Sequence, residues 1–179
     1  MPANEKSITS NDKDKTGWFF DSPDRSSIVY ISIYMVMNLG LFSCLFMMRR
    51  NDQYFETIDD LSGLSKNHPI LSLSLLVILF SLAGIPPLAG FFAKFYVFKS
   101  VIEQSMYFLS IVGLLSTVIA AFYYLRIIKV IYFDEEKEKY DTDHSVLLKI
   151  SLTFSTLLIL LYFIFPSKLV EIVSSINII

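Results

Sequence analysis

The sequence predicts an all-α integral membrane protein with four transmembrane helices, the second of which is broken at Gly84–Pro87. Hydrophobic residues make up 54% of the 179 residues. The charged residues are confined to polar blocks that separate four long apolar runs. Each run reaches the ~20 residues that a helix needs to cross a bilayer core of about 30 Å. Two adjacent prolines in the middle of the second run predict the break.

Each predicted helix follows from one apolar run. Residues 28–48, 69–93 and 106–125 contain no charged side chain, and the fourth run, 146–165, is broken only by Lys149 near its start. Residues 1–27 are polar and lack an apolar segment, so we expect a mobile tail and no cleavable signal. The transmembrane domain is then 28–179, with spans at about 28–48, 69–98, 106–130 and 146–165.

The second run is too long for one straight helix. At 1.5 Å per residue, residues 69–98 would extend about 45 Å. Consecutive prolines remove two backbone donors and clash with the preceding turn. Irregular backbone at membrane depth is tolerated only where it is buried in protein or lines water, and broken helices of this kind are typical of ion-coupled transporters. The sequence therefore predicts two half-helices, the second over 88–99, and a hinge of four residues: Gly84, Pro86, Pro87 and Gly90.

Lys94, in the second half-helix, is the predicted catalytic residue for proton transfer. A lysine at the centre of a membrane helix costs about 3 kcal/mol on insertion scales, which marks it as functional. Lysine can release and regain a proton, whereas arginine cannot. The alternative is that Lys94 extends to the membrane surface, as we expect of Lys99. The adjacent break favours the functional interpretation and a buried lysine, because a surface-reaching side chain needs no broken helix beside it.

Three further residues are candidates for a supporting role in proton transfer. Arg126 and Lys129 share a helix face at i, i+3. Interfacial anchoring beside Tyr123 and Tyr124 is the competing explanation for both. His68, at the entrance of the second span, is suited to passing protons between bulk water and the interior, and a simple surface histidine is its alternative.

Other polar and small residues predict contacts between helices. Asn38 in the first span is a candidate donor of an interhelical hydrogen bond. The loop over residues 51–68 predicts a short helix along the membrane interface. Four small residues at helical spacing in the third span predict a close helix approach, namely Ser110, Gly113, Thr117 and Ala120.

Charge placement predicts the orientation and excludes several classes of protein. Lysines and arginines are more frequent in the loops after the first and third spans, which predicts that these loops are cytoplasmic and that both termini are non-cytoplasmic. The one cysteine, Cys44, cannot supply a cysteine-ligated cluster or a disulfide framework. The sequence has no basic stripe of the kind that binds nucleic acid, so nucleic-acid binding is not predicted.

Four quoted stretches carry a family resemblance. The segment "SLAGIPPLAGFFAKFYVF" resembles the broken helix of the antiporter-like membrane subunits of respiratory complex I. With "YMVMNLGLF", "DDLSGLSKNHP" and "AAFYYLRIIKVIYF", residues 28–179 resemble the C-terminal portion of subunit N of NADH-quinone oxidoreductase, which is subunit 2 in mitochondria. The broken-helix motif alone would also fit subunits L and M and multisubunit sodium/proton antiporters.

The resemblance implies a membrane segment of a proton-translocating NADH:quinone oxidoreductase, a translocase of the respiratory electron-transport chain. Lys94 would lie on its hydrophilic proton axis. No cofactor is expected in this chain; NADH, FMN, iron–sulfur clusters and quinone would belong to other subunits. The implied partners are other complex I membrane subunits, including neighbouring antiporter-like subunits, and the lipid of a bacterial plasma membrane or mitochondrial inner membrane. Two alternatives remain open, namely a subunit of a multisubunit cation/proton antiporter and a non-conducting membrane scaffold fragment.

The sequence departs from the family in its length. Members contain two inverted repeats, and roughly the first ten helices of that pattern are missing here. A truncated sequence, the product of a split gene and an engineered piece would each explain the departure. We expect no complete proton path from this chain on its own.

Overall fold

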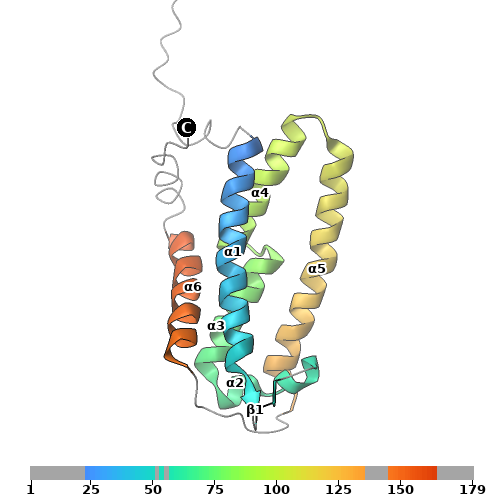
Figure 1. Cartoon of the computed structure of the whole chain (residues 1–179). Coiled ribbons are helices and arrows are strands. Elements are labelled where there is room, and N and C mark those ends of the chain that lie inside the picture. The colour runs from blue at the N-terminus through green and yellow to red at the C-terminus, as the bar shows by residue number, and fades with distance from the viewer. Residues whose placement is uncertain (1–22, 51–52, 55–56, 136–144, 165–179) are drawn as a thin grey trace, which may run out of the picture.

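A computed structural model describes residues 23–50, 53–54, 57–135 and 145–164, which form a helical bundle (Figure 1). A two-stranded antiparallel pair and two short helical turns connect the first long helix to the rest of the bundle. In chain order the elements are α1 (Pro23–Met47), β1 (Arg49–Arg50), β2 (Gln53–Tyr54), η2 (Ile58–Leu61), α2 (Leu64–Asn67), α3 (Pro69–Ala83), α4 (Ala89–Glu103), α5 (Tyr107–Phe133) and α6 (Val146–Ile164).

The first helix begins earlier than predicted. We expected a polar tail up to residue 27, but α1 starts at Pro23. Proline suits the first turn of a helix, since its fixed φ is helical and its missing N–H would be unpaired there anyway. Most of the predicted tail, residues 1–22, lies outside the described residues.

The second predicted span consists of two helices separated by a gap. The chain leaves α3 through Gly84, whose φ of 82° is in the left-handed region. The Gly84 N–H donates to Ser81 O at 3.0 Å and the Ile85 N–H to Phe80 O at 3.1 Å, the two hydrogen bonds of a Schellman motif. After Pro86 and Pro87, α4 begins at Ala89 and continues to Glu103, beyond the predicted end at Lys99.

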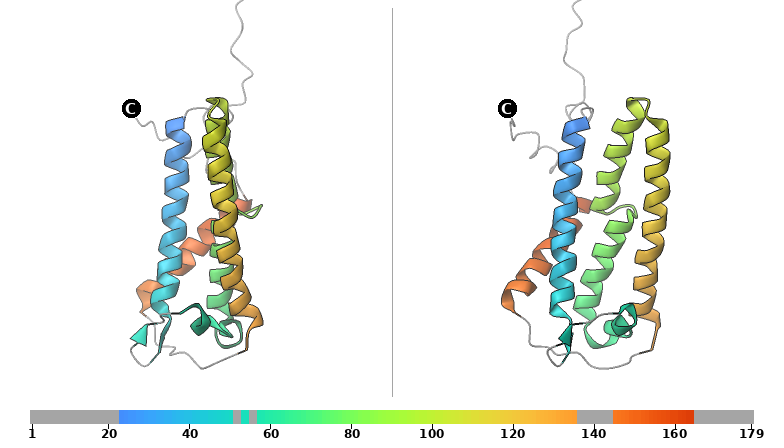
Figure 2. Two further views of the ribbon diagram at one scale, coloured as in Figure 1. Left: turned by 90° about the vertical axis from the view of Figure 1, so that its right-hand side faces the viewer. Right: turned by 45° about the vertical axis from the view of Figure 1, so that its right-hand side comes forward.

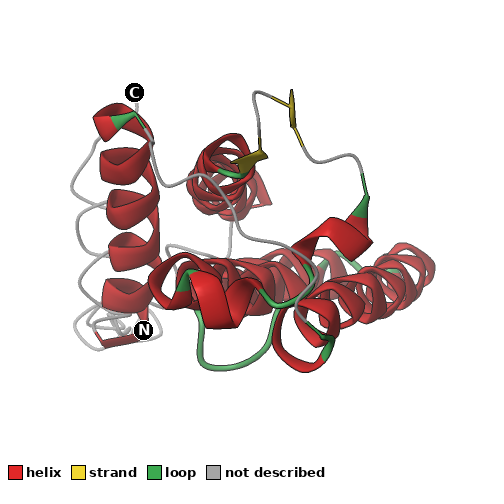
Figure 3. Cartoon of the chain, turned by 90° about the horizontal axis from the view of Figure 1, so that it is seen from below, coloured by secondary structure: helices red, strands yellow, loops and turns green. Residues whose placement is uncertain are grey.

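The segment between α1 and α3 contains more structure than the single interfacial helix that we predicted. Arg49 pairs with Tyr54 across the two strands, yellow in Figure 3. Two helical turns follow, η2 and α2, separated by Gly63 at a φ of 73°. The left-handed glycine explains why one continuous helix does not form, because most other residues are strained in that conformation.

The core of the bundle surrounds α3. Leu75, Ile78 and Leu79 of this helix are each at most 1% exposed. α3 packs against α1, α5 and α6, and α1 in turn packs against α4 and α6. Figure 2 shows that α6 crosses α1 obliquely. The two halves of the broken region therefore lie against the same helix, α1.

Small and polar residues bring α1 and α6 together. Ser43 Oγ lies 2.8 Å from Ser151 Oγ, and Ser155 Oγ donates to Val36 O at 2.5 Å. A Cβ added at Gly40 would lie 2.8 Å from Ser155 Cβ. Such contacts let backbones approach closely in a membrane, where helix packing replaces the hydrophobic effect. The prediction for Asn38 is wrong in this respect, because its Nδ2 donates to Tyr34 O within α1.

The outward faces of the bundle are apolar. By length and composition, residues Ser27–Met47 and Tyr107–Phe133 are long enough to cross a membrane, whereas Pro69–Ala83 and Val146–Tyr162 form shorter apolar helices. Phe108 on α5 is 82% exposed. Many other large apolar side chains of α1, α5 and α6 are exposed as well, as is typical of a protein that contacts lipid or other proteins.

Replacing Gly40 with valine should destabilise the contact between α1 and α6. The added side chain would overlap Ser155 and Ile78, and overpacking typically costs about 1–3 kcal/mol. We expect a lower unfolding temperature of the detergent-solubilised protein. Leu39→Val is the matched control, since Leu39 is 51% exposed. Equal unfolding temperatures for the two variants would contradict the close packing.

Candidate functional site

Lys94 lies in the second turn of α4, and its side chain reaches back to the end of α3. Its Nζ donates to Leu82 O at 2.8 Å. The last carbonyls of a helix have no partner within the helix and carry the negative end of its dipole. The amine of Lys94 therefore caps α3 from a different helix.

Lys94 is half-buried, so the prediction of a buried lysine is wrong for the described chain. The physical reason is a pocket of about 190 Å³ between α1, α5 and the break, into which the side chain is partly exposed. Besides Lys94, the polar residues that line the pocket are Tyr30, Tyr34, Ser116, Thr117 and Tyr124. Among the described residues, no carboxylate lines the pocket, and none forms an ion pair with Lys94.

Gly84 contributes to the site in two ways. Its positive φ turns the chain out of α3, and the aliphatic part of Lys94 packs against it. A Cβ added at Gly84 would lie 3.3 Å from Lys94 Cδ. The first hinge residue thus leaves room for the lysine side chain on its way to Leu82.

Gly90, also predicted as part of the hinge, permits contact between the two helix ends. Its N–H donates to Ser81 Oγ at 3.0 Å, and a Cβ added there would collide with the carbonyl oxygen of Ser81. Ser81 Oγ in turn donates to Met37 Sδ of α1 at 3.0 Å. Ser81 is fully buried. One serine hydroxyl therefore joins three helices at the break.

Ser81, Tyr30 and Tyr34 were not among the residues predicted from the sequence, and Tyr124 was considered only as a neighbour of interfacial anchors. Ser81 is the nearest polar side chain before the hinge in a stretch of apolar residues, and this position was the available signal. Its pairing with Gly90 depends on how the chain turns between α3 and α4. Tyr30 and Tyr34, with ring centroids 5.9 Å apart, come from a different predicted span.

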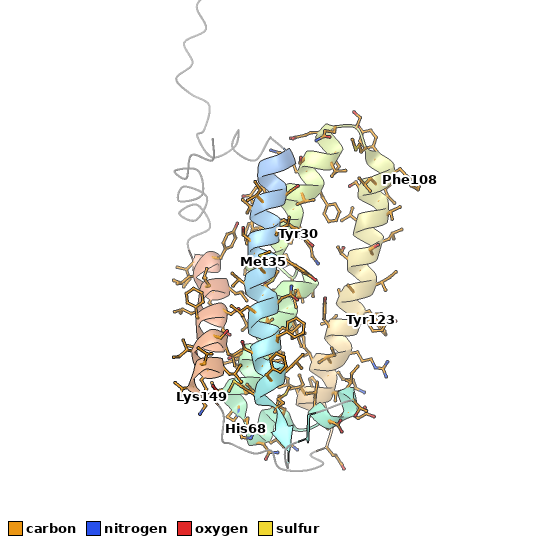
Figure 4. The ribbon with its side chains drawn as sticks, in the orientation of Figure 1. Tyr30, Met35, His68, Phe108, Tyr123 and Lys149 are labelled. Carbon is orange, nitrogen blue, oxygen red and sulfur yellow. The ribbon has the colours of Figure 1, made fainter. Side chains whose placement is uncertain are left out.

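The remaining predicted residues lie in separate places. Pro86 and Pro87 are exposed in the gap and joined by a cis peptide bond. His68 lies between α2 and α3, about 20 Å along α3 from Leu82 at 1.5 Å per residue. Figure 4 shows His68 near the lower end of the bundle, well below Tyr30. The structure does not bring His68 to the lysine.

Arg126 and Lys129, which were predicted to support proton transfer, do not contact the site. Both residues are exposed on α5, beyond the part of that helix that lines the pocket. Lys129 Nζ lies 3.8 Å from Asp134 Oδ1. This pair fits the competing explanation, that of anchoring at the helix end.

The small-residue face of α5 serves two purposes. Ser110 is buried, and a Cβ added at Gly113 would lie 2.8 Å from Phe98 Cε1 of α4, so this part packs closely as predicted. Thr117 and Ala120 continue the face along the pocket. Within the described residues, no group of histidine, cysteine, aspartate and glutamate side chains could hold a metal ion.

The fold and site define a helical membrane-type bundle with an interrupted helix and a lysine at the interruption. The sequence model of the family described as "NADH:quinone oxidoreductase/Mrp antiporter, TM" matches residues 20–120. The chain belongs to this family.

Two individual relatives show which members of the family this chain resembles. The chain is 85% identical over 155 residues to NADH-quinone oxidoreductase subunit N of Pelagibacter ubique, covering 87% of this chain and 33% of the relative. It is 46% identical over 143 residues to the subunit N of Paramagnetospirillum magneticum, covering 80% and 29%. The chain thus spans about a third of the length of these relatives.

A solved structure has a similar fold. A chain of respiratory complex I from Thermus thermophilus with bound aureothin aligns with a TM-score of 0.70 and 21% identity. The alignment covers 85% of this chain and 36% of that one. It supports the arrangement of the helices in the described residues.

Replacing Gly90 with alanine should separate the two helix ends. The new methyl group would collide with backbone at Ser81, so a helix must move, and we expect the amount of folded subunit in the membrane to fall. Gly113→Ala is the control, because the obstructing atom there belongs to the Phe98 ring, which can rotate. Quantitative immunoblotting of the membrane fraction measures the difference. An equal amount of both variants would contradict the backbone contact at Gly90.

Proposed function

We propose that this chain is the C-terminal part of a subunit N of a proton-translocating NADH:quinone oxidoreductase, and that it carries part of the proton path through Lys94. The observation that carries the proposal is the lysine amine held at a helix interruption beside a polar pocket. Family membership and the 85% identity to a subunit N support it. The complete subunit would be about three times as long as this chain.

The geometry of Lys94 suits proton transfer. A lysine ammonium has three N–H donors, and one is directed at Leu82 O. Tyr30, Tyr34 and Tyr124 also line the pocket beside Lys94, and a tyrosine hydroxyl can both donate and accept a hydrogen bond. Proton exchange requires partners within hydrogen-bonding reach, directly or through one water molecule. A pocket of about 190 Å³ is large enough for several water molecules.

We further propose that α1, the α3–α4 pair, α5 and α6 are four membrane crossings. α3 and α4 contain 15 residues each, or about 22 Å, so neither alone crosses a core of about 30 Å. Together, with the break inside the membrane, they do. The sides on which the α1–α3 and α5–α6 connections lie, where lysines and arginines are more frequent, would then be cytoplasmic and both termini non-cytoplasmic.

Redox chemistry would take place in other subunits, which would hold NADH, FMN, the iron–sulfur clusters and quinone. Neighbouring membrane subunits of the complex and lipid would cover the apolar outer faces. The family description also includes Mrp antiporters, so redox-independent cation/proton exchange is the second candidate function.

Replacing Lys94 with alanine in the assembled complex should lower the initial rate of NADH-driven proton pumping by about a hundredfold or more, the contribution typical of a positioned proton-transfer group. The measurement is fluorescence quenching in inverted membrane vesicles, normalised to the amount of complex. Lys99→Ala is the matched control, because Lys99 pairs with Glu103 at the surface, 3.5 Å apart. Full pumping in Lys94→Ala would refute the proposal. Cation-dependent proton exchange without NADH would favour the antiporter.

The orientation can be tested by labelling single cysteines. Lys66→Cys lies in the segment between α1 and α3, and Gln104→Cys in the turn between α4 and α5; both positions are exposed. We expect a membrane-impermeant maleimide to label residue 66 in inverted vesicles and residue 104 in intact cells or spheroplasts. Labelling of both residues from the same side would contradict four crossings with a broken second span.

A further inference from the structure

The two helix ends at the break satisfy each other's backbone groups. α4 begins without a side-chain cap of its own, and the buried N–H of Gly90, in its first turn, would be unpaired without Ser81. In the last turn of α3, the carbonyl of Leu82 accepts from Lys94 Nζ at 2.8 Å. The first four N–H groups and the last four C=O groups of a helix need such outside partners. Each half-helix therefore supplies one cap to the other.

We propose that Ser81 is a positioning residue for Lys94: its hydroxyl fixes the start of α4 against the end of α3, so that the lysine amine reaches the Leu82 carbonyl at the edge of the pocket. This inference rests on the proposed function, in which Lys94 transfers protons. Ser81 itself does not line the pocket.

Three observations carry the assignment. Ser81 is fully buried, and its hydroxyl both accepts from the Gly90 N–H and donates to Met37 Sδ. The donated hydrogen bond fixes the direction of the hydroxyl, which leaves an oxygen lone pair for Gly90. Gly90 and Lys94 are four residues apart, about one turn of α4. A movement of the Gly90 end would therefore move the amine as well.

Few other side chains at position 81 could accept the hydrogen bond from the Gly90 N–H. Alanine at position 81 would leave a buried N–H without a partner, and a lost partner of this kind is costly in a low-dielectric interior. Because Gly90 lies against the Ser81 backbone, the most direct relief is a shift of α4 that opens the gap to water. Such a shift separates Lys94 Nζ from Leu82 O.

The test uses three variants of the assembled complex in membranes, each measured for proton pumping per complex. Ser81→Ala should lower pumping by roughly three- to tenfold, the range expected for one lost buried hydrogen bond. Ser81→Thr, which retains a hydroxyl, should recover at least half of the parent rate. Ser72→Ala is the control: Ser72 is also buried on α3, but its Oγ donates only within its own first turn, to Pro69 O at 2.9 Å, so pumping should not change.

A cryo-electron-microscopy structure of each assembled variant supplies a readout besides activity. We expect the contact between Lys94 Nζ and Leu82 O to be lost in Ser81→Ala and retained in Ser72→Ala. Retention of that contact in Ser81→Ala, or parent-like pumping by that variant, would overturn the positioning role. Loss of pumping in Ser72→Ala to the same degree would also overturn it, as would a Ser81→Thr complex that pumps no better than Ser81→Ala.

The outcomes separate this inference from the proposed function. Full pumping by Lys94→Ala removes the proposed function, while the structure of Ser81→Ala still reports whether the hydroxyl holds the amine in place. Pumping lost in Lys94→Ala and retained in Ser81→Ala leaves the proposed function intact and removes the positioning role alone.

Discussion

The structure depends on how the free backbone N–H and C=O groups at the end of α3 and the start of α4 find hydrogen-bond partners. An interrupted helix exposes backbone donors and acceptors, and in lipid each unsatisfied group costs several kcal/mol. Here the Schellman hydrogen bonds at Gly84, the Ser81 hydroxyl and the Lys94 amine provide the partners. The interruption is stable because these groups come from the two half-helices themselves, and Met37 of α1 accepts from the Ser81 hydroxyl.

This constraint explains the unusual composition of the stretch. Gly84 provides a left-handed turn and space for a lysine stem, and Gly90 allows backbone contact with Ser81. The prolines prevent the helix from continuing through the gap. A lysine in this position meets the negative end of a helix dipole and a polar pocket instead of lipid. The same features that stabilise the break thereby accommodate a charge inside an apolar chain.

The rest of the bundle supports the break from outside. α1 supplies Met37 to the Ser81 hydroxyl, and serine contacts and Gly40 hold α1 close to α6. α5 closes the other side, where Gly113 allows Phe98 of α4 to approach. Helices pack closely without a hydrophobic driving force only where small residues permit it. The outer faces carry large apolar side chains, which suits lipid or neighbouring subunits.

The sequence by itself determined the helical class, the approximate bounds of the helices and the place of the interruption, and it predicted a functional role for Lys94, which stays a prediction. These features follow from local rules, because charge-free runs, prolines and glycines act within a few residues along the chain. Only the tertiary structure decided that Lys94 is half-buried and hydrogen-bonded to the Leu82 carbonyl. It also decided that His68, Arg126 and Lys129 lie away from the pocket beside Lys94. It also decided the partner of Ser81, since that contact depends on the angle between two helices. Hydrogen bonds between residues brought together by a turn cannot be read from spacing, because the direction of the chain after Gly84 is set by packing against α1 and α5.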